Sequence, residues 1–281
     1  MGLIEQIVWL ALSILATRFF VPRLFKMLKS RGMVVMNYRG KPVVISMGLA
    51  FLFPCFAGII SFIVSKPDTS YMAFLLVVTA LALIGFIDDV LGDTAVKGIK
   101  GHVGTLFKGN ISTGGIKLII TALTGMYVSW CYHRELMAWV VYALLFSLFV
   151  NFINLMDLRP GRAIKVFMLS VIVIVTLGGF SNIWMFIPLL ASLPFYIKGE
   201  MEERYMLGDT GANLLGGIIG LYAIKEVPFV PAAVMLTALI SIHVIAEYHS
   251  LSKFIESIPA LRFIDQLGRL KVDGDTNVDR A

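Results

Sequence analysis

The stretch LLVVTALALIGFIDD, residues 75–89, joins a long apolar run to two adjacent aspartates, Asp88 and Asp89. Such a run approaches the roughly 20 residues that a helix needs to cross the hydrocarbon core of a membrane. An aspartate near the membrane interior costs about 2.5 to 3.5 kcal/mol on insertion scales. Two of them at the end of one predicted span call for a partner such as a cation, so the stretch predicts both a fold class and a site.

The rest of the chain repeats this apolar pattern. Of its 281 residues, 58% are hydrophobic and 15% are charged, and the mean hydropathy is +0.85. One soluble core cannot bury that much apolar surface, so we expect an all-α polytopic membrane protein with about nine transmembrane helices. Residues 1–249 would form one transmembrane domain of catalytic type, and residues 250–281 a cytosolic amphipathic tail. The predicted spans are residues 3–22, 44–65, 71–89, 114–132, 136–153, 164–178, 181–197, 210–224 and 228–247.

Basic residues alternate between the loops. They gather after the first, third, fifth and seventh spans, whereas the opposite loops hold Lys66, Arg134 and Lys225. By the positive-inside rule the N-terminus lies outside, and the basic loops and the tail face the cytosol. The first run lacks the features of a cleaved signal peptide, so we expect a multi-pass protein of the plasma membrane with a cytosolic active face. The basic loop residues are Arg23, Lys26, Lys29, Arg31, Arg39, Lys41, Lys97, Lys100, Lys108, Arg159, Arg162, Lys198 and Arg204.

The tail has apolar residues at helical spacing with charged residues between them. Pro259 should divide it into two short helices. We expect this pair of helices to lie along the membrane surface. The apolar positions are Leu251, Phe254, Ile255, Ile258, Leu261, Ile264 and Leu267.

A second polar string, NFINLMD over residues 151–157, ends the fifth predicted span. Its spacing places Asn151 and Asn154 on one face of the helix, and Asp157 follows directly. Two amides and a carboxylate in this position are suited to hold a polar ligand.

A third string, LGDTGAN over residues 207–213, begins the eighth span. We expect Asp209 to be the N-cap of this helix, and Gly208 and Gly211 to let a ligand approach the backbone closely. The free N–H groups of a helix start suit a phosphate. Loop charge alone places this string, the asparagine string and the paired aspartates on one side of the membrane, which indicates a shared site.

Hard carboxylate oxygens without nearby Cys or His favour Mg²⁺, completed by waters and substrate phosphates. Lys117 lies one turn into the fourth span, where the cost of insertion predicts a carboxylate or substrate partner. A carboxylate cluster ringed by basic residues would bind a metal and attract a diphosphate. For the loop residues the alternative is topology and contact with anionic lipid. The basic residues concerned are Lys97, Lys100, Lys108, Lys117, Arg159 and Arg162.

At these residues the chain resembles the polyprenyl-phosphate N-acetylhexosamine-1-phosphate transferase superfamily. That superfamily includes the bacterial phospho-MurNAc-pentapeptide translocase and the GlcNAc-1-phosphate transferases. Four strings occur in the family's order, each at the predicted cytosolic end of a span. They are Gly40-Lys41-Pro42 through Met47-Gly48, similar to its first cytosolic loop, Gly85 to Asp89, similar to its paired-Asp motif, Asn151 to Asp157, similar to its Asn-x-x-Asn-Leu-x-Asp motif, and Gly208-Asp209-Thr210-Gly211, similar to its Gly-Asp-x-Gly motif.

The resemblance implies that a polyprenyl phosphate attacks the β-phosphate of a nucleotide-sugar, with Mg²⁺ required, and that a nucleoside monophosphate leaves. It implies that Asp88, Asp89 and Asp209 are catalytic, with Asp209 and Asp88 as metal ligands. The implied partners are a polyprenyl phosphate lipid, a nucleotide-sugar and the membrane, with no nucleic acid and with homodimerisation by analogy. Together with two arginines that the chain adds, the substrate-binding candidates are Lys41, Lys117, Asn151, Asn154, Asp157, Arg159, Arg162 and Gly208.

The chain departs from the family pattern in two places. The family motif continues Gly-x-Asp-Gly after Asn-Leu-x-Asp, whereas Leu158-Arg159-Pro160-Gly161 follows here. Pro160 therefore replaces an Asp that the family associates with nucleobase recognition. The family's His-rich loop and last span are also replaced, by His249 and the amphipathic tail. Both departures indicate a divergent subgroup with an altered substrate.

Two other classes of function stay open at this point. A transporter would carry ionisable residues near mid-span, where this chain has mainly His243. A catalytically lapsed relative would bind polyprenyl phosphate or a partner enzyme as a scaffold, which Pro160 and the missing His-rich loop favour. The retained Asp88, Asp89 and Asp209 argue against the scaffold, because without a metal they only add to the cost of insertion.

Overall fold

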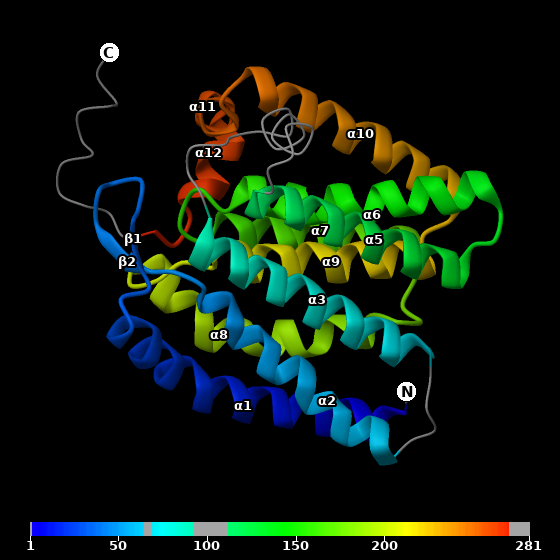
Figure 1. The fold of residues 1–281 in the computed structure, drawn as a ribbon, viewed down its shortest axis with the longest axis horizontal. Coiled ribbons are helices and arrows are strands. Elements are labelled where there is room, and N and C mark those ends of the chain that lie inside the picture. The colour runs from blue at the N-terminus through cyan, green and yellow to red at the C-terminus, as the bar shows by residue number, and fades with distance from the viewer. Residues whose placement is uncertain (1, 65–68, 93–111, 270–281) are drawn as a thin grey trace.

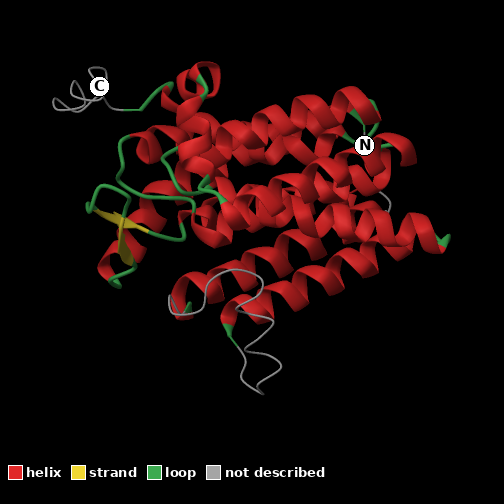
Figure 2. Cartoon of the chain, turned by 90° about the horizontal axis from the view of Figure 1, so that it is seen from above, coloured by secondary structure: helices red, strands yellow, loops and turns green. Residues whose placement is uncertain are grey.

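The computed structural model describes residues 2–64, 69–92 and 112–269, without the side chains of residues 59–64. Lys66, Lys97, Lys100 and Lys108 lie outside the described residues. The chain folds into a bundle of roughly aligned helices with a small hairpin at one end (Figure 1, Figure 2). The helices are α1 Leu3–Ser30, α2 Leu52–Val64, α3 Thr69–Leu91, α5 Thr113–Tyr132, α6 Leu136–Met156, α7 Arg162–Gly178, α8 Ile187–Met201, α9 Gly208–Glu226, α10 Phe229–Tyr248, α11 Leu251–Ser257 and α12 Pro259–Gln266.

The all-α membrane fold predicted from the sequence is confirmed. Among the described residues, five helices are long and apolar enough to cross a membrane, namely α1, α3, α5, α6 and α10. The other four predicted spans coincide with α2, α7, α8 and α9, which are shorter or less apolar. Helix α9 is enclosed by other helices and does not need a strongly apolar surface, because it contacts little lipid. Nine crossings therefore stay a prediction.

Helix α9 forms the centre of the bundle. It packs against α3, α5, α6 and α7, and every residue from Thr210 to Ile224 is buried. Small residues permit this close packing. A Cβ atom built on Gly216 would lie 2.6 Å from the backbone of Val150, and one built on Gly217 would lie 2.1 Å from Leu81. The central position of α9 fixes its first turn relative to the ends of α3 and α6.

A short antiparallel hairpin, β1 Val34–Met36 with β2 Pro42–Val44, lies at the end of the bundle where α6 and α8 finish (Figure 1). Val44 also bridges to Tyr205 in the α8–α9 connection, with the Met206 N–H donating to the Val44 carbonyl at 2.9 Å. A 3-10 turn, η1 Met47–Phe51, follows the hairpin and packs on α9. A second 3-10 turn, η2 Ile183–Phe186, precedes α8. The hairpin thus ties the first loop to the start of α9.

The tail folds as two short helices, α11 and α12, separated at Pro259 as predicted. Helix α10 runs along the outside of the bundle against α6, and only 11% of its most apolar window is buried. At the end of α10 the chain turns back, and α11 and α12 lie at the same end of the molecule as the hairpin (Figure 1).

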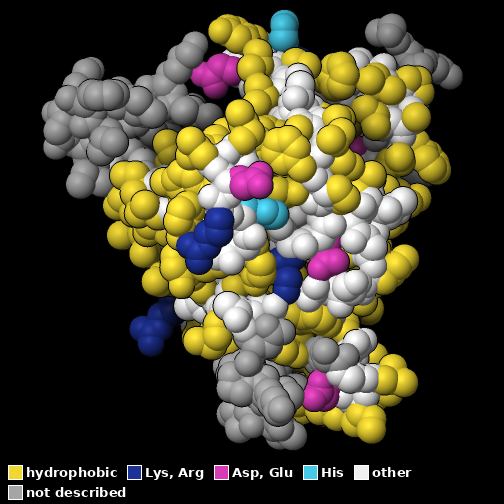
Figure 3. All heavy atoms as spheres, turned by 90° about the vertical axis from the view of Figure 1, so that its right-hand side faces the viewer, with side chains coloured by type: hydrophobic (Ala, Val, Ile, Leu, Met, Phe, Trp, Pro, Cys, Tyr) yellow, Lys and Arg dark blue, Asp and Glu magenta, His cyan; other side chains and the backbone are white. Residues whose placement is uncertain are grey.

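The opposite end of the bundle carries few basic side chains. Figure 3 views this end, where hydrophobic side chains share the face with uncharged side chains and backbone, and few Lys or Arg side chains are seen. The basic residues Arg134 and Lys225 belong to this end, beside α5, α6 and the last turn of α9. The hairpin end holds most of the described basic loop residues, so the two ends differ in charge as the loop pattern predicts. Assignment of the hairpin end to the cytosol stays a prediction.

Candidate active site

Three helices bring a lysine and two aspartates together at the hairpin end. Asp88 lies near the end of α3, Lys117 in the second turn of α5 and Asp209 in the first turn of α9. The Lys117 Nζ atom lies 2.8 Å from a carboxylate oxygen of each aspartate. The three side chains are 12 to 25% exposed. We call them the carboxylate cluster, and the partner predicted for Lys117 is thus present.

The charge of the carboxylate cluster is not balanced. Two carboxylates face one ammonium group where water is largely excluded, so one negative charge is left over when both aspartates are ionised. Unbalanced charge in such an environment is costly unless a further cation is bound or a proton is taken up. No group of three or more His, Cys, Asp or Glu side chains arranged for a metal occurs in the part of the chain that the structure describes. The oxygen pair of Asp88 and Asp209 is therefore the place where a cation gains most.

Asp89 lies beside the cluster and holds the start of α9. Its Oδ1 atom accepts a hydrogen bond from the Asp209 N–H at 2.9 Å. Its Oδ2 atom accepts bonds from the Thr210 N–H at 3.2 Å, the Thr210 hydroxyl at 2.6 Å and the Ser46 hydroxyl at 2.8 Å. A carboxylate that accepts the first N–H groups of a helix stabilises it as a cap.

The cap predicted at Asp209 is wrong, because Asp89 supplies it from another helix. Asp209 lies inside the first turn of α9, and its N–H is one of the donors that need capping. This arrangement turns the Asp209 side chain toward Lys117 instead of toward its own backbone.

Glycines allow the three polar strings to meet. A Cβ atom on Gly85 would lie 2.4 Å from the Asp209 carbonyl oxygen, and one on Gly48 would lie 2.2 Å from the Gly211 Cα atom. Gly208 has φ +71°, in the left-handed region that L side chains rarely adopt. The backbone of the α9 turn therefore rests directly on α3 and η1, which no larger side chain would permit.

Asp157 follows α6 and reaches the same turn. Its Oδ2 atom accepts a hydrogen bond from the Gly208 N–H at 2.9 Å, and only 8% of the residue is exposed. Burial, together with the nearby carboxylates of Glu200 and Asp209, raises the pKa of Asp157 well above its usual range. Asp157 thus contacts the residue that precedes Asp209 of the carboxylate cluster.

Asn151 and Asn154 are half-buried on α6, roughly two turns and one turn before Asp157. Their position on one helix agrees with the spacing of the string. In the described residues the hydrogen bonds of the carboxylate cluster involve neither asparagine. The structure therefore does not join them to the cluster.

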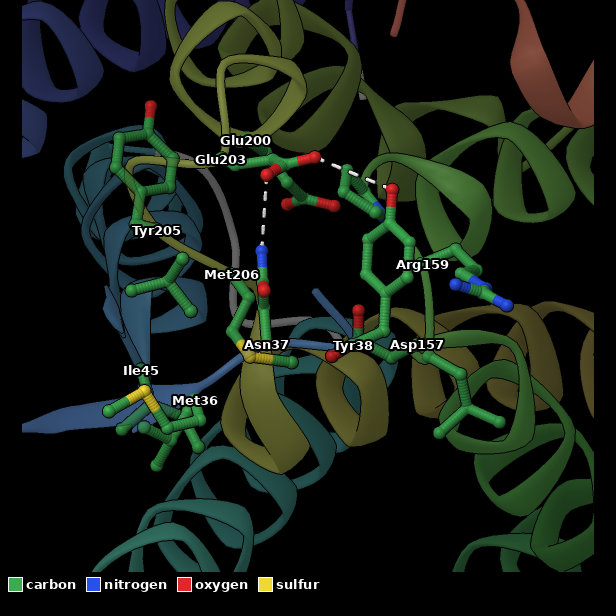
Figure 4. Close-up of a pocket in the computed structure, with 14 residues that line it drawn as sticks. Met36, Asn37, Tyr38, Ile45, Asp157, Arg159, Glu200, Glu203, Tyr205 and Met206 are labelled. Atoms are coloured by element: carbon green, nitrogen blue, oxygen red, sulfur yellow. Dashed lines mark hydrogen bonds between the residues drawn. The ribbon is translucent and has the colours of Figure 1, made fainter. Parts of the chain in front are cut away.

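A cavity of about 340 Å³ opens between the hairpin, the α6–α7 turn and the α8–α9 turn (Figure 4). Its lining combines apolar hairpin residues with seven polar side chains. Asp157 lines the cavity and also bonds to Gly208, so the cavity and the carboxylate cluster lie on either side of one residue. The polar lining residues are Asn37, Tyr38, Asp157, Arg159, Glu200, Glu203 and Tyr205.

Glu203 organises the hairpin side of this cavity. It accepts hydrogen bonds from Asn37 at 3.2 Å and from the Tyr38 hydroxyl at 3.4 Å (Figure 4). It also pairs with Arg39 at 3.3 Å and with Lys41 at 3.2 Å. Lys41, a substrate-binding candidate, is therefore at the rim with its side chain 51% exposed.

The two added arginines have different surroundings. Arg159 lines the cavity, with its guanidinium 4.1 Å from the centre of the Tyr38 ring and 3.2 Å from Glu256 in the tail. Arg162 is buried and donates to Asp265 at 2.7 and 3.0 Å and to Ser252 at 2.9 Å. Arg162 therefore faces the tail and does not line the cavity, unlike Arg159.

Sequence reasoning missed four residues of this region, Ser46, Tyr38, Glu200 and Glu203. The acidic run Gly199 to Glu203 in an otherwise basic loop was a usable signal for the two glutamates. Ser46 has φ +63°, which no local pattern indicates. Tyr38 is placed by the hairpin, whose pairing is a tertiary feature.

A family model described as Glycosyl transferase family 4 matches residues 71–226. The matched segment runs from the start of α3 to the end of α9 and contains the whole carboxylate cluster and Asp157. No curated protein matches the chain.

Proposed function

Because the chain belongs to glycosyl transferase family 4, we propose that this membrane transferase moves a sugar-1-phosphate from a nucleotide-sugar to a polyprenyl phosphate at the cytosolic face of the plasma membrane. The product would be a lipid diphosphate sugar. One observation carries the proposal: the carboxylate cluster, with its unbalanced negative charge, lies next to a cavity large enough for part of a ligand. Ligand sites of this kind commonly measure about 300 to 1,000 Å³.

The reaction needs no covalent intermediate with the protein, because the lipid phosphate attacks the donor directly. An oxygen of the polyprenyl phosphate attacks the β-phosphorus of the donor, the bond from this phosphorus to the bridging oxygen breaks, and the nucleoside monophosphate leaves. Such in-line transfer depends on positioning and on neutralising phosphate charge. Lys117 is suited to the second task, since its ammonium group is held between α3 and α9 by two carboxylates. Asp89 is suited to the first, because its bonds fix the turn that carries Asp209.

Magnesium fits the residues of the carboxylate cluster. Asp88 and Asp209 offer hard oxygen ligands only, and Mg²⁺ is commonly held by one or two carboxylates with phosphates and waters completing its shell. When bound, it would neutralise charge on the transferring phosphate. Asp88 and Asp209 would hold the ion, and Lys117 would remain as a second positive group beside it.

The cavity is the proposed place for the donor. Asp157 and Arg159 line it, and Arg159 stacked on Tyr38 offers a cationic, flat surface for a nucleotide. Gly208 bonds to Asp157 and Lys41 pairs with Glu203, so both contact residues that line the cavity. Asn151 and Asn154 remain donor-site candidates on the preceding turns of α6. The acceptor lipid would arrive from the membrane side, where exposed apolar helices surround the bundle.

A catalytically lapsed scaffold is the second candidate. The observation that favours it is the ion pair of Arg162 with Asp265 in the tail. This predicted substrate-binding residue is already bonded within the protein. A scaffold has no use for the unbalanced carboxylate cluster, whose charge only disfavours membrane insertion. A transporter is less favoured still, since the cluster lies at helix ends and not at mid-span.

The first experiment is a donor panel. Purified protein with polyprenyl phosphate, Mg²⁺ and a set of nucleotide-sugars should release a nucleoside monophosphate with at least one donor. Asp209→Ala should abolish the release, whereas Glu135→Gln, which removes an exposed carboxylate at the far end of α6, should not. Absence of turnover with every donor, with cellular function intact in Asp209→Ala, would overturn the proposal in favour of the scaffold.

A further inference from the structure

The turn that follows Asp157 is held by the C-terminal tail. Arg159 pairs with Glu256, the Pro160 carbonyl accepts a bond from Arg269 at 3.2 Å, and Arg162 donates to Asp265. Three of the four residues in the 159–162 turn are thus bonded to the tail. The fourth, Gly161, donates its N–H to Glu200 at 2.8 Å. This turn also forms one wall of the cavity through Arg159 and Pro160.

Asp265 is the centre of the attachment. Both of its carboxylate oxygens accept bonds from Arg162, and Oδ1 also accepts from Arg269 at 2.6 Å. Its carbonyl accepts a bond from Lys165 at 2.7 Å. Burial alone would raise the pKa of Asp265, but the hydrogen bond from Arg162 and the charge of Arg269 lower it below the usual value. The carboxylate is therefore ionised throughout the physiological range.

Helix α12 has no apolar attachment that could replace this ion pair. All of its residues are described, and Asp265 is the one that is buried. The large apolar side chains of α12, Leu261, Phe263 and Ile264, are 39 to 68% exposed. Within the protein, α12 is therefore held by charge, and its outward apolar side chains suit the membrane surface expected for the tail. Loss of the Asp265 charge should release α12 from the 159–162 turn, while the bundle stays folded.

We propose that α11 and α12 act as a latch on the 159–162 turn, and that Asp265 is a positioning residue for binding of the nucleotide-sugar donor. The proposal rests on the donor lying in the cavity. Asp265 does not contact that cavity; it acts through Arg162 and, by way of Arg269, through the Pro160 carbonyl. The tail, a distant segment of the same chain, thereby supports the 159–162 turn.

The latch has a specific kinetic consequence. The carboxylate cluster is separated from the tail by Asp157 and the α9 turn. Releasing the tail should therefore weaken donor binding without changing the chemistry at saturating donor. Misplacement of a binding wall by about 1 Å is enough to change rates up to a hundredfold.

The test compares Asp265→Asn with Glu247→Gln, which removes an exposed carboxylate on α10 outside the latch. In Asp265→Asn the donor KM should rise about tenfold, while kcat and the KM for polyprenyl phosphate stay within about twofold. Amide hydrogen exchange should become faster in residues 259–266 and 159–162. Glu247→Gln should leave all four quantities unchanged.

A second variant separates support from direct binding. Arg162→Leu combined with Asp265→Leu replaces the buried ion pair with apolar side chains, a change that often preserves packing. Arg269 keeps its bond to the Pro160 carbonyl in this variant but loses Asp265. If Arg162 acts only through the latch, exchange should be slower and the donor KM lower than in Asp265→Asn. Slower exchange without a fall in the donor KM would show that Arg162 itself binds the donor, and would overturn the positioning role.

Other outcomes are equally clear. Faster exchange with an unchanged donor KM would overturn the proposal, as would a fall in kcat that accompanies every change in KM. A wild-type protein that binds a nucleotide-sugar without turning it over would end the proposed function but not the latch. In that case the equilibrium dissociation constant of the donor should rise about tenfold in Asp265→Asn, and an unchanged constant would contradict the latch.

Discussion

The carboxylate cluster and the latch are built from the same kinds of side chain in opposite proportions. In the cluster, two aspartates share one lysine. In the latch, one aspartate carboxylate is shared by two arginines, Arg162 and Arg269. The cluster therefore has an excess of negative charge and gains from a further cation. The latch has an excess of positive charge, but its arginines also donate to Ser252 and to the Pro160 carbonyl. The sign of the excess charge and the bonds already made within the protein, more than residue type, separate a site suited to a cation from a structural contact.

The sharpest way to break this comparison is to remove one carboxylate from the cluster. Asp88→Asn should lower transfer about a thousandfold, because a metal ligand and charge are lost. Its thermal unfolding midpoint should stay equal or rise, since the variant removes the unbalanced charge beside Asp209.

Asp265→Asn should lower the temperature at which the tail loses its protection from amide exchange, because it leaves two arginines without their carboxylate. Nucleotide release and thermal unfolding in nanodiscs would measure both effects, and a large loss of midpoint in Asp88→Asn would contradict the charge argument.

A smaller effect is expected at Asp157, which lies between the two regions. Its pKa is raised in the folded protein, so the folded state holds a proton that the unfolded chain releases above about pH 4. Stability should therefore fall as the pH rises from that value through the folded pKa. Asp157→Asn retains an oxygen to accept the Gly208 N–H and cannot ionise. It should unfold at a higher temperature than the wild type at pH 8 and at a similar temperature near pH 4.

Unfolding curves over this pH range decide the matter. If the unfolding temperatures of the wild type and Asp157→Asn change with pH in parallel, Asp157 is ionised in the folded protein. Arg159→Gln is a useful control, because it changes charge at the cavity without touching the bond to Gly208.

The sequence predicted the fold class because long apolar runs have few alternatives to membrane helices. It also predicted that the paired aspartates, Lys117 and the GDTG string share one end of the bundle, since loop charge and span order fix the side of each. It could not predict that Asp89 caps α9, because the cap joins residues 120 positions apart. Only packing against Gly85 and Gly48 brings that turn close enough.

The tail shows a different limit of sequence reasoning. The helical spacing of its apolar residues and the break at Pro259 follow from the sequence, and both agree with α11 and α12. Its attachment does not, because Arg162 and Asp265 are separated by 103 positions. The place of Arg162 beside the Asp157 motif predicts a substrate ligand. A charge near a motif indicates a location, but only the structure shows which partner the charge has.

The central claim is that the carboxylate cluster accepts a divalent cation, and binding of Mn²⁺ as a Mg²⁺ substitute tests it most directly. Electron paramagnetic resonance of the purified wild-type protein should show bound Mn²⁺ that Mg²⁺ displaces. The affinity should fall at least about tenfold when Asp88 and Asp209 are both changed to Asn, and should be unchanged in Glu135→Gln. Equal Mn²⁺ binding by the wild type and the double variant, or none by the wild type, would contradict the account.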